Sequence, residues 1–74
     1  MKFSELFEDV RCGNATRRRG WVGYWTWDND QDTIILHCKD GTTLDIRLTN
    51  DVKFTVDNLL SDDWELCEPE LRKI

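Results

Sequence analysis

The sequence is poor in the residues that mark several common classes of protein. It has one proline, one histidine and three cysteines, and no apolar run reaches the length of about 18 residues that a membrane span needs. Cys12, Cys38 and Cys67 are odd in number, and none belongs to a C-x-x-C pair. Neither a disulfide framework nor a zinc ribbon fits this spacing. We therefore expect a cytoplasmic protein without a membrane partner, whose three thiols are buried as small hydrophobic side chains.

Basic residues are outnumbered by acidic ones. Ten Lys and Arg residues stand against fifteen Asp and Glu residues, which gives a formal net charge of −5. A protein that binds nucleic acid irrespective of sequence needs a basic surface that displaces counterions, so we expect no nucleic-acid partner. Acidic residues interrupt the N-terminal segment where a signal peptide is continuously apolar, so no export signal is expected.

The length of 74 residues allows one domain. We expect a folded core at residues 1–68 and a charged tail at residues 69–74, which begins at the single proline. Four Trp and three Phe residues are available for the core, and each large aromatic side chain buries about 150–250 Å². Oligomerisation is a common further source of stability in domains of this size.

Apolar residues at helical spacing from Phe3 to Val10 predict a short amphipathic helix at residues 3–11. Ser4 is the expected N-cap of this helix, and Gly13 is the expected C-terminal stop. A helix with one apolar stripe needs a sheet to cover, which the rest of the sequence supplies.

From Ala15 onward the polarity alternates with a period of two, which predicts strands. Asp40-Gly41 is a strong hairpin signal because glycine accepts a positive φ, and Thr55 can cap one helical turn at residues 56–60. The expected strands begin at Ala15 and then span residues 24–27, 33–38, 42–48 and 64–67. The predicted fold class is α+β: a small antiparallel sheet of about five strands, with one N-terminal helix packed on it and a short helical turn before the last strand.

The acidic sequence Asp28-x-Asp30-x-Asp32 begins like a calcium-binding loop. Such a loop needs Gly at its sixth position and a bidentate Glu at its twelfth, and these positions hold Thr33 and Lys39 here. We therefore interpret the three carboxylates as a solvated hairpin tip and expect no metal site.

Catalytic residues are not indicated either. His37 and Cys38 are neighbours on a predicted strand, so their side chains point to opposite faces and cannot act as a base and a nucleophile together. The G-x-S-x-G motif of serine hydrolases is absent. We expect a protein that is not an enzyme and carries no cofactor.

The basic run from Arg17 to Arg19 has two interpretations. Arginine forks match phosphate oxygens in a bidentate way, which favours an anion site. Alternatively, these arginines form surface salt bridges with the acidic C-terminal half.

The aromatic residues also have two interpretations. Trp21, Tyr24, Trp25 and Trp27 lie within seven positions, and such rings stack on nucleobases for about 1–3 kcal/mol per base. At least one or two of them are expected in the core instead. Because both faces of strand 24–27 carry aromatic rings and one helix covers one face, the other face is buried by a partner or ligand or stays exposed.

Two motifs bracket nearly the whole chain. The first runs from Met1 and Phe3 through a short helix and Gly13 to the segment Ala15-Thr16-Arg17-Arg18-Arg19-Gly20-Trp21. The second runs from Thr55 through Asp57-Asn58-Leu59-Leu60-Ser61-Asp62-Asp63-Trp64-Glu65-Leu66. With these motifs the chain resembles a family of small phage and prophage proteins that includes the second class of Thoeris anti-defence proteins and anti-CRISPR relatives. The middle departs from the family, with Val22-Gly23 where relatives often have an Asn-Gly-Lys turn and Val52-Lys53-Phe54 where many have a Trp.

The resemblance implies a protein that binds a nucleotide signal without cleaving it. Thoeris anti-defence members form homo-oligomers, typically tetramers, and sequester a cyclic ADP-ribose signal, and some members also hold cyclic dinucleotides. The motif positions that carry over to ligand binding here are Arg18, Trp21 and Asp63, with Trp25 and Asn58 as further candidates. Arginine suits phosphates, tryptophan a base, and aspartate the ribose hydroxyls. Trp64 is expected in the core.

Two alternatives remain open from the sequence. One is a protein–protein inhibitor of a bacterial defence effector, such as an anti-CRISPR protein, which uses the acidic segment at residues 57–70 to occupy a groove built for nucleic acid. The other is a small oligomeric phage domain with a structural or unknown role.

Overall fold

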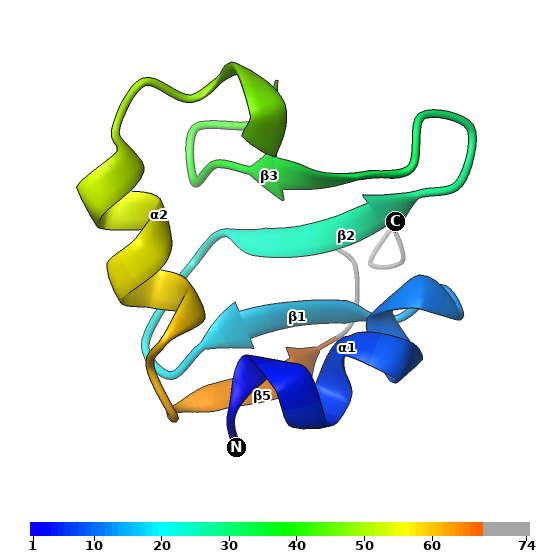
Figure 1. Ribbon diagram of the computed structural model, residues 1–74, viewed down its shortest axis with the longest axis vertical. Coiled ribbons are helices and arrows are strands. Elements are labelled where there is room, and N and C mark those ends of the chain that lie inside the picture. Colours follow the sequence, from blue (N-terminus) through cyan, green and yellow to red (C-terminus); the bar gives the residue numbers. More distant parts are fainter. Residues whose placement is uncertain (68–74) are drawn as a thin grey trace.

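Five strands form one antiparallel sheet in the computed structural model, which describes residues 1–67 of the chain. The order across the sheet is β4-β3-β2-β1-β5, so the first and last strands of the chain lie side by side (Figure 1). In chain order the elements are α1 (Phe3–Arg11), β1 (Ala15–Arg18), β2 (Tyr24–Asp28), β3 (Thr33–His37), β4 (Thr43–Asp45), the 3-10 helix η1 (Ile46–Leu48), α2 (Val52–Leu59) and β5 (Trp64–Cys67). The predicted α+β fold class is confirmed, including the N-terminal helix, the five strands and a second short helix before the last strand.

Helix α1 supplies one side of the core. Phe3, Leu6 and Val10 are buried against the sheet, where α1 contacts β2 and β5. The predicted bounds of this helix are confirmed, and so is its stop at Gly13, which has a φ of +113° and donates its N–H to the Val10 carbonyl oxygen at 3.0 Å. The predicted N-cap was wrong. The helix is capped at Lys2 rather than Ser4, because the Glu5 carboxylate accepts the Lys2 backbone N–H at 2.7 Å.

Aromatic rings fill the centre of the core. Trp64 is 2% exposed and its ring lies 4.9 Å from Trp25, 5.0 Å from Phe3 and 5.3 Å from Trp21, measured between centroids. Tilted and edge-to-face rings at such distances are favourable beyond their area burial. The expected core role of Trp64 is confirmed.

The predicted strand at residues 42–48 was too long. β4 ends at Asp45, and residues 46–48 form η1. The Asp45 carboxylate accepts the backbone N–H of Arg47 at 2.8 Å and its side-chain Nη2–H at 2.6 Å. These bonds give the backbone a local alternative to the strand ladder, which an alternating pattern does not reveal.

The second helix begins earlier than predicted. α2 starts at Val52 because Asp51 caps it, with its carboxylate accepting the Phe54 N–H at 2.9 Å. Thr55, the predicted cap, lies inside the helix, and its hydroxyl donates to the Asp51 carbonyl oxygen at 3.1 Å. An Asp at the N-cap has the same capping chemistry as Thr, and Asp51 comes first along the chain, so the helix begins one turn earlier.

The expectation that the three cysteines are buried was wrong. Cys12 and Cys38 are exposed and Cys67 is half-buried. Cys12 is the C-cap of α1 and Cys38 follows the end of β3, so both lie where the chain leaves the core. The predicted tail at residues 69–74 and the last core residue, Glu68, lie outside the described residues. None of the helices within residues 1–67 has the length and apolar character to cross a membrane.

Candidate functional site

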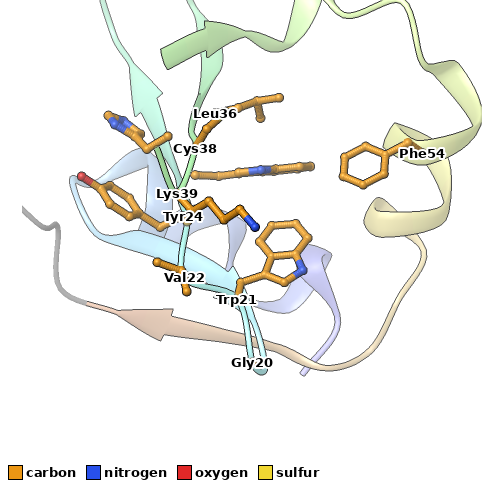
Figure 2. Close-up of a pocket in the computed structure, with 11 residues that line it drawn as sticks. Gly20, Trp21, Val22, Tyr24, Leu36, Cys38, Lys39 and Phe54 are labelled. Carbon is orange, nitrogen blue, oxygen red and sulfur yellow. The ribbon is translucent and has the colours of Figure 1, made fainter. Parts of the chain in front are cut away.

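A pocket of about 380 Å³ opens between the β1–β2 connection, the end of β3 and helix α2 (Figure 2). This volume lies within the range of small-molecule sites. Its lining residues are mostly aromatic or aliphatic and come from three separate segments of the chain: Gly20, Trp21, Val22, Gly23, Tyr24 and Trp25; Leu36, His37, Cys38 and Lys39; and Phe54.

Three of the lining rings differ in exposure, and this assigns them different parts in the pocket. Trp25 is 4% exposed and belongs to the core, so it forms the floor. Trp21 is half-buried, with its ring centroid 5.8 Å from that of Trp25. Phe54 is 52% exposed and projects from α2 toward the pocket, as Figure 2 shows. Trp21 and Phe54 are therefore the rings that a ligand can reach.

The end of β3 borders the pocket, but the His37 side chain lies on the opposite face of the sheet from Trp25, because His37 pairs with Tyr24 while Trp25 pairs with Leu36. His37 stacks on Tyr24 with centroids 4.4 Å apart and planes 11° apart, and its Nε2 lies 2.8 Å from the Thr26 hydroxyl oxygen. Burial lowers the pKa of His37 below its ordinary value, so this side chain is neutral at pH 7. Lys39, which Figure 2 shows extending across the pocket, is the charged side chain among the lining residues.

The backbone on one side of the pocket lies directly against β3. A methyl group at Gly23 would overlap the carbonyl oxygen of His37, so the connection before β2 can approach this closely only with glycine. Val22 and Gly23 thus form part of the wall of the pocket.

Arg18 lies beside the pocket in a network of its own. Its Nε donates to Asp63 Oδ1 at 2.7 Å, its Nη2 to Asp63 Oδ2 at 3.1 Å, and its Nη1 to Asn58 Oδ1 at 2.7 Å. The hydrogen bond from Arg18 holds the pKa of Asp63 below its ordinary value, and the same bond raises the pKa of Arg18. The side chains of this bidentate pair are about one-third exposed, at 29% and 34%.

Asn58 connects this network to α2 and to the core. It is 3% exposed, and its Nδ2 donates to the Phe54 carbonyl oxygen at 2.8 Å. The indole N–H of Trp64 donates to the Asn58 carbonyl oxygen at 2.8 Å. One asparagine therefore holds α2 against β1 and β5 through hydrogen bonds in several directions.

The five candidate residues from the sequence fall into two adjacent groups. Arg18, Asn58 and Asp63 form the polar network, while Trp21 and Trp25 line the pocket. Trp64 lies between the groups, since its ring contacts Trp21 and its N–H binds Asn58. None of the three network residues is among the residues that line the pocket.

Two pocket residues were not selected from the sequence. Phe54 lies in the segment Val52-Lys53-Phe54, a departure from the family that the chain resembles, and that difference is the signal the sequence offers. Lys39 follows β3 in a turn beside the Asp40-Gly41 hairpin, and nothing in its local sequence links it to a site.

Asp28 of the acidic loop and Arg17 of the basic run have structural partners. Asp28 Oδ1 accepts the backbone N–H groups of Asp30 and Gln31 at 2.9 and 3.3 Å. Arg17 Nε donates to Glu65 Oε2 at 3.0 Å. Within residues 1–67, no group of three or more His, Cys, Asp and Glu side chains could hold a metal ion.

No protein-family model, curated protein or solved structure matches the chain.

Proposed function

We propose that this protein binds a cyclic nucleotide signal of bacterial defence, a cyclic ADP-ribose isomer or a cyclic dinucleotide, and sequesters it without cleaving it. The proposed setting is the cytoplasm of a bacterial host, where the protein acts as a phage-type anti-defence protein and as a homo-oligomer, a dimer or tetramer. The observation that supports the proposal best is the pocket in which Trp21 and Phe54 are reachable and Lys39 supplies a positive charge.

The ligand class follows from the chemistry of the lining residues. A flat base gains about 1–3 kcal/mol from stacking on an aromatic side chain, and both Trp21 and Phe54 offer such a surface. A lysine ammonium group contacts phosphate oxygens as a point charge. Lys39 supplies that charge locally in a chain whose net charge of −5 otherwise repels anions.

The hydrogen bonds of Arg18 change which residue we expect to contact a phosphate. A phosphate at Arg18 would compete with the Asp63 carboxylate, which already receives two bonds from the guanidinium. We therefore assign the first phosphate contact to Lys39 and a positioning role to Arg18. A carboxylate has about four lone-pair sites, so Asp63 keeps acceptor capacity for ribose hydroxyls.

Binding is favoured over turnover by the contacts of the histidine at the end of β3. The His37 Nε2 lies 2.8 Å from the Thr26 hydroxyl oxygen. A general base needs a nitrogen within reach of the proton that it takes up, and this nitrogen is engaged inside the sheet.

Calorimetric titration with cyclic ADP-ribose isomers and with cyclic dinucleotides tests the proposal. We expect Phe54→Ala to weaken binding about 5- to 150-fold, which is the loss of one stacking contact, and Lys39→Ala to weaken it as well. Leu48→Ala and Lys2→Ala, which are exposed and outside the pocket, are matched controls and should leave affinity unchanged.

The fate of the ligand tests sequestration separately from binding. Ligand released from the heat-denatured complex should have its original mass. A hydrolysed product would overturn sequestration, and the absence of binding by every ligand of both classes would overturn the whole proposal.

A protein–protein inhibitor is the second candidate function. Exposed apolar residues on α2 favour a protein contact, whereas the acidic segment is partly neutralised, because Asp63 and Glu65 are paired with Arg18 and Arg17. Reversing the charges of Asp62, Glu65 and Glu68 should weaken such an inhibitor and leave nucleotide binding nearly intact; Glu68 lies outside the described residues.

A further inference from the structure

Helix α2 carries an apolar stripe that points away from the rest of the molecule. Val52 and Val56 are 70% and 44% exposed, and Leu60, the C-cap of α2, is 79% exposed. Their spacing of four residues places them on one side of the helix. The residue of α2 that is buried, Asn58, lies about 200° around the helix from Val56, because each residue advances by about 100°. Figure 1 shows α2 beside the sheet and apart from α1.

Two opposite charges border this stripe. Lys53 and Asp57 are one turn apart on the same flank, with Nζ 2.7 Å from Oδ2, and their side chains are 86% and 60% exposed. When two copies of such a helix pack antiparallel about a two-fold axis, the charged flank of one copy lies beside the charged flank of the other. The two flanks run in opposite directions along the pair. Lys53 of each copy then lies opposite Asp57 of the other, and the stripes meet with Val56 near the axis.

We propose that the outer face of α2 is a self-complementary interface that pairs with α2 of a second copy of this chain. The apolar stripe supplies the buried surface, and the border charges favour the antiparallel direction, because an antiparallel two-fold pairing brings the same flank of both copies together and a parallel pairing does not. The proposal specifies the surface behind the homo-oligomer part of the proposed function, but it does not depend on ligand binding.

The pairing would leave the pocket accessible. Phe54 lies about 160° around the helix from Val56, next to the position of Asn58, so its ring points toward the pocket when the stripe faces a second copy. Contact between two copies would hold α2, and with it Phe54, in a fixed position.

The mass in solution tests the interface first. Sedimentation equilibrium should give at least twice the mass of the 8.8 kDa chain, because a tetramer is two such pairs. Val56→Asp should remove the pairing, since it would bury a carboxylate at the axis, and its far-UV circular dichroism should match the wild type. Val22→Asp is the matched control, because Val22 is 71% exposed and lies outside α2.

Charge reversal tests the antiparallel register. Lys53→Asp alone places acidic side chains opposite each other, and Asp57→Lys alone places basic side chains opposite each other, so each variant should pair more weakly than the wild type. An equimolar mixture of the two variants should form heterodimers, because the acidic flank of one chain then lies opposite the basic flank of the other. A bond within one chain cannot be restored by mixing, which separates this result from an effect on the helix itself.

Three results would overturn the proposal. One is a wild-type protein that stays monomeric at high concentration, which would leave the stripe to a foreign protein. Another is an oligomer that persists in Val56→Asp, which would place the interface elsewhere. The third is a mixture of the two charge variants that pairs no better than either variant alone.

Discussion

The two helices of this molecule have similar lengths and opposite relations to the core. α1 buries Phe3, Leu6 and Val10 against the sheet, so its position is determined by apolar contacts. α2 buries Asn58 and packs Leu59 against the core, while Val52, Val56 and Leu60 are exposed, so hydrogen bonds contribute much of its attachment. An amphipathic helix normally directs its apolar side inward, and α2 leaves a large part of its apolar surface exposed.

The difference between the helices assigns them different roles: α1 contributes to the stability of the fold, and α2 contributes to a surface that can bind. Apolar burial contributes most of the folding free energy, and in this molecule it is concentrated where α1 meets Trp25 and Trp64. Elements with few buried apolar contacts open locally at lower free energy and are the usual source of adjustable binding surfaces. α2 has that character and also carries Phe54, which lines the pocket.

The same substitution in α1 and at the C-cap of α2 gives the largest contrast. Leu6 is fully buried and Leu60 is 79% exposed. Leu6→Ala should lower the free energy of unfolding by about 2–5 kcal/mol, because it leaves a cavity in the core. Leu60→Ala should change it by less than about 0.5 kcal/mol. Urea denaturation of dilute protein measures both, and equal losses would show that α2 is as much a part of the core as α1.

Removing the polar attachment of α2 should have a smaller and more local effect. Asn58→Ala deletes the bonds to Arg18 and to the Phe54 carbonyl oxygen, at an expected cost of about 1–3 kcal/mol. Amide hydrogen exchange should become faster throughout α2 while the protection of α1 is retained. Asn50→Ala, at an exposed position just before α2, is the control; acceleration of equal size in α1 would contradict the local attachment.

Most of the fold could be predicted because its signals are local. The stripe from Phe3 to Val10 determines α1, and the alternation after Ala15 determines the strands. The errors fell where a side chain binds a nearby backbone group: Glu5 binds the Lys2 N–H, so the N-cap of α1 is Lys2 rather than Ser4, and Asp45 ends β4 early. Such bonds depend on one side-chain conformation, which hydrophobic periodicity does not report.

The candidate site was only partly predictable because it is assembled from distant segments. The motif positions Arg18 and Asp63 are 45 residues apart and meet because β1 pairs with β5. Lys39 reaches the pocket from the turn after β3, and Phe54 reaches it from α2. The positions of this turn and this helix depend on the whole fold. The sequence suggested which residue types could bind a nucleotide, but it did not separate the network around Arg18 from the rings around Trp21.

The ion pair between Arg18 and Asp63 should produce the smallest effect. We expect to see it as a dependence of the free energy of unfolding on pH. Arg18 holds the pKa of Asp63 below the ordinary value of 3.8, so the folded state binds a proton less readily than the unfolded state. The stabilisation is therefore present at neutral pH and is lost as the pH falls below that ordinary value. Urea midpoints between pH 7 and pH 3 should fall less steeply in Asp63→Asn than in the wild type.

Arg18→Met should flatten the pH profile in the same way, and the double variant should flatten it no further. Asp40 and Asp45, whose pKa values are also lowered by hydrogen bonds, should maintain a residual slope in every variant. If the profiles of the variants run parallel to that of the wild type, the ion pair contributes no net stability, because water solvates the separated charges equally well. The hydrogen bonds of Asn58 are then the main attachment of α2.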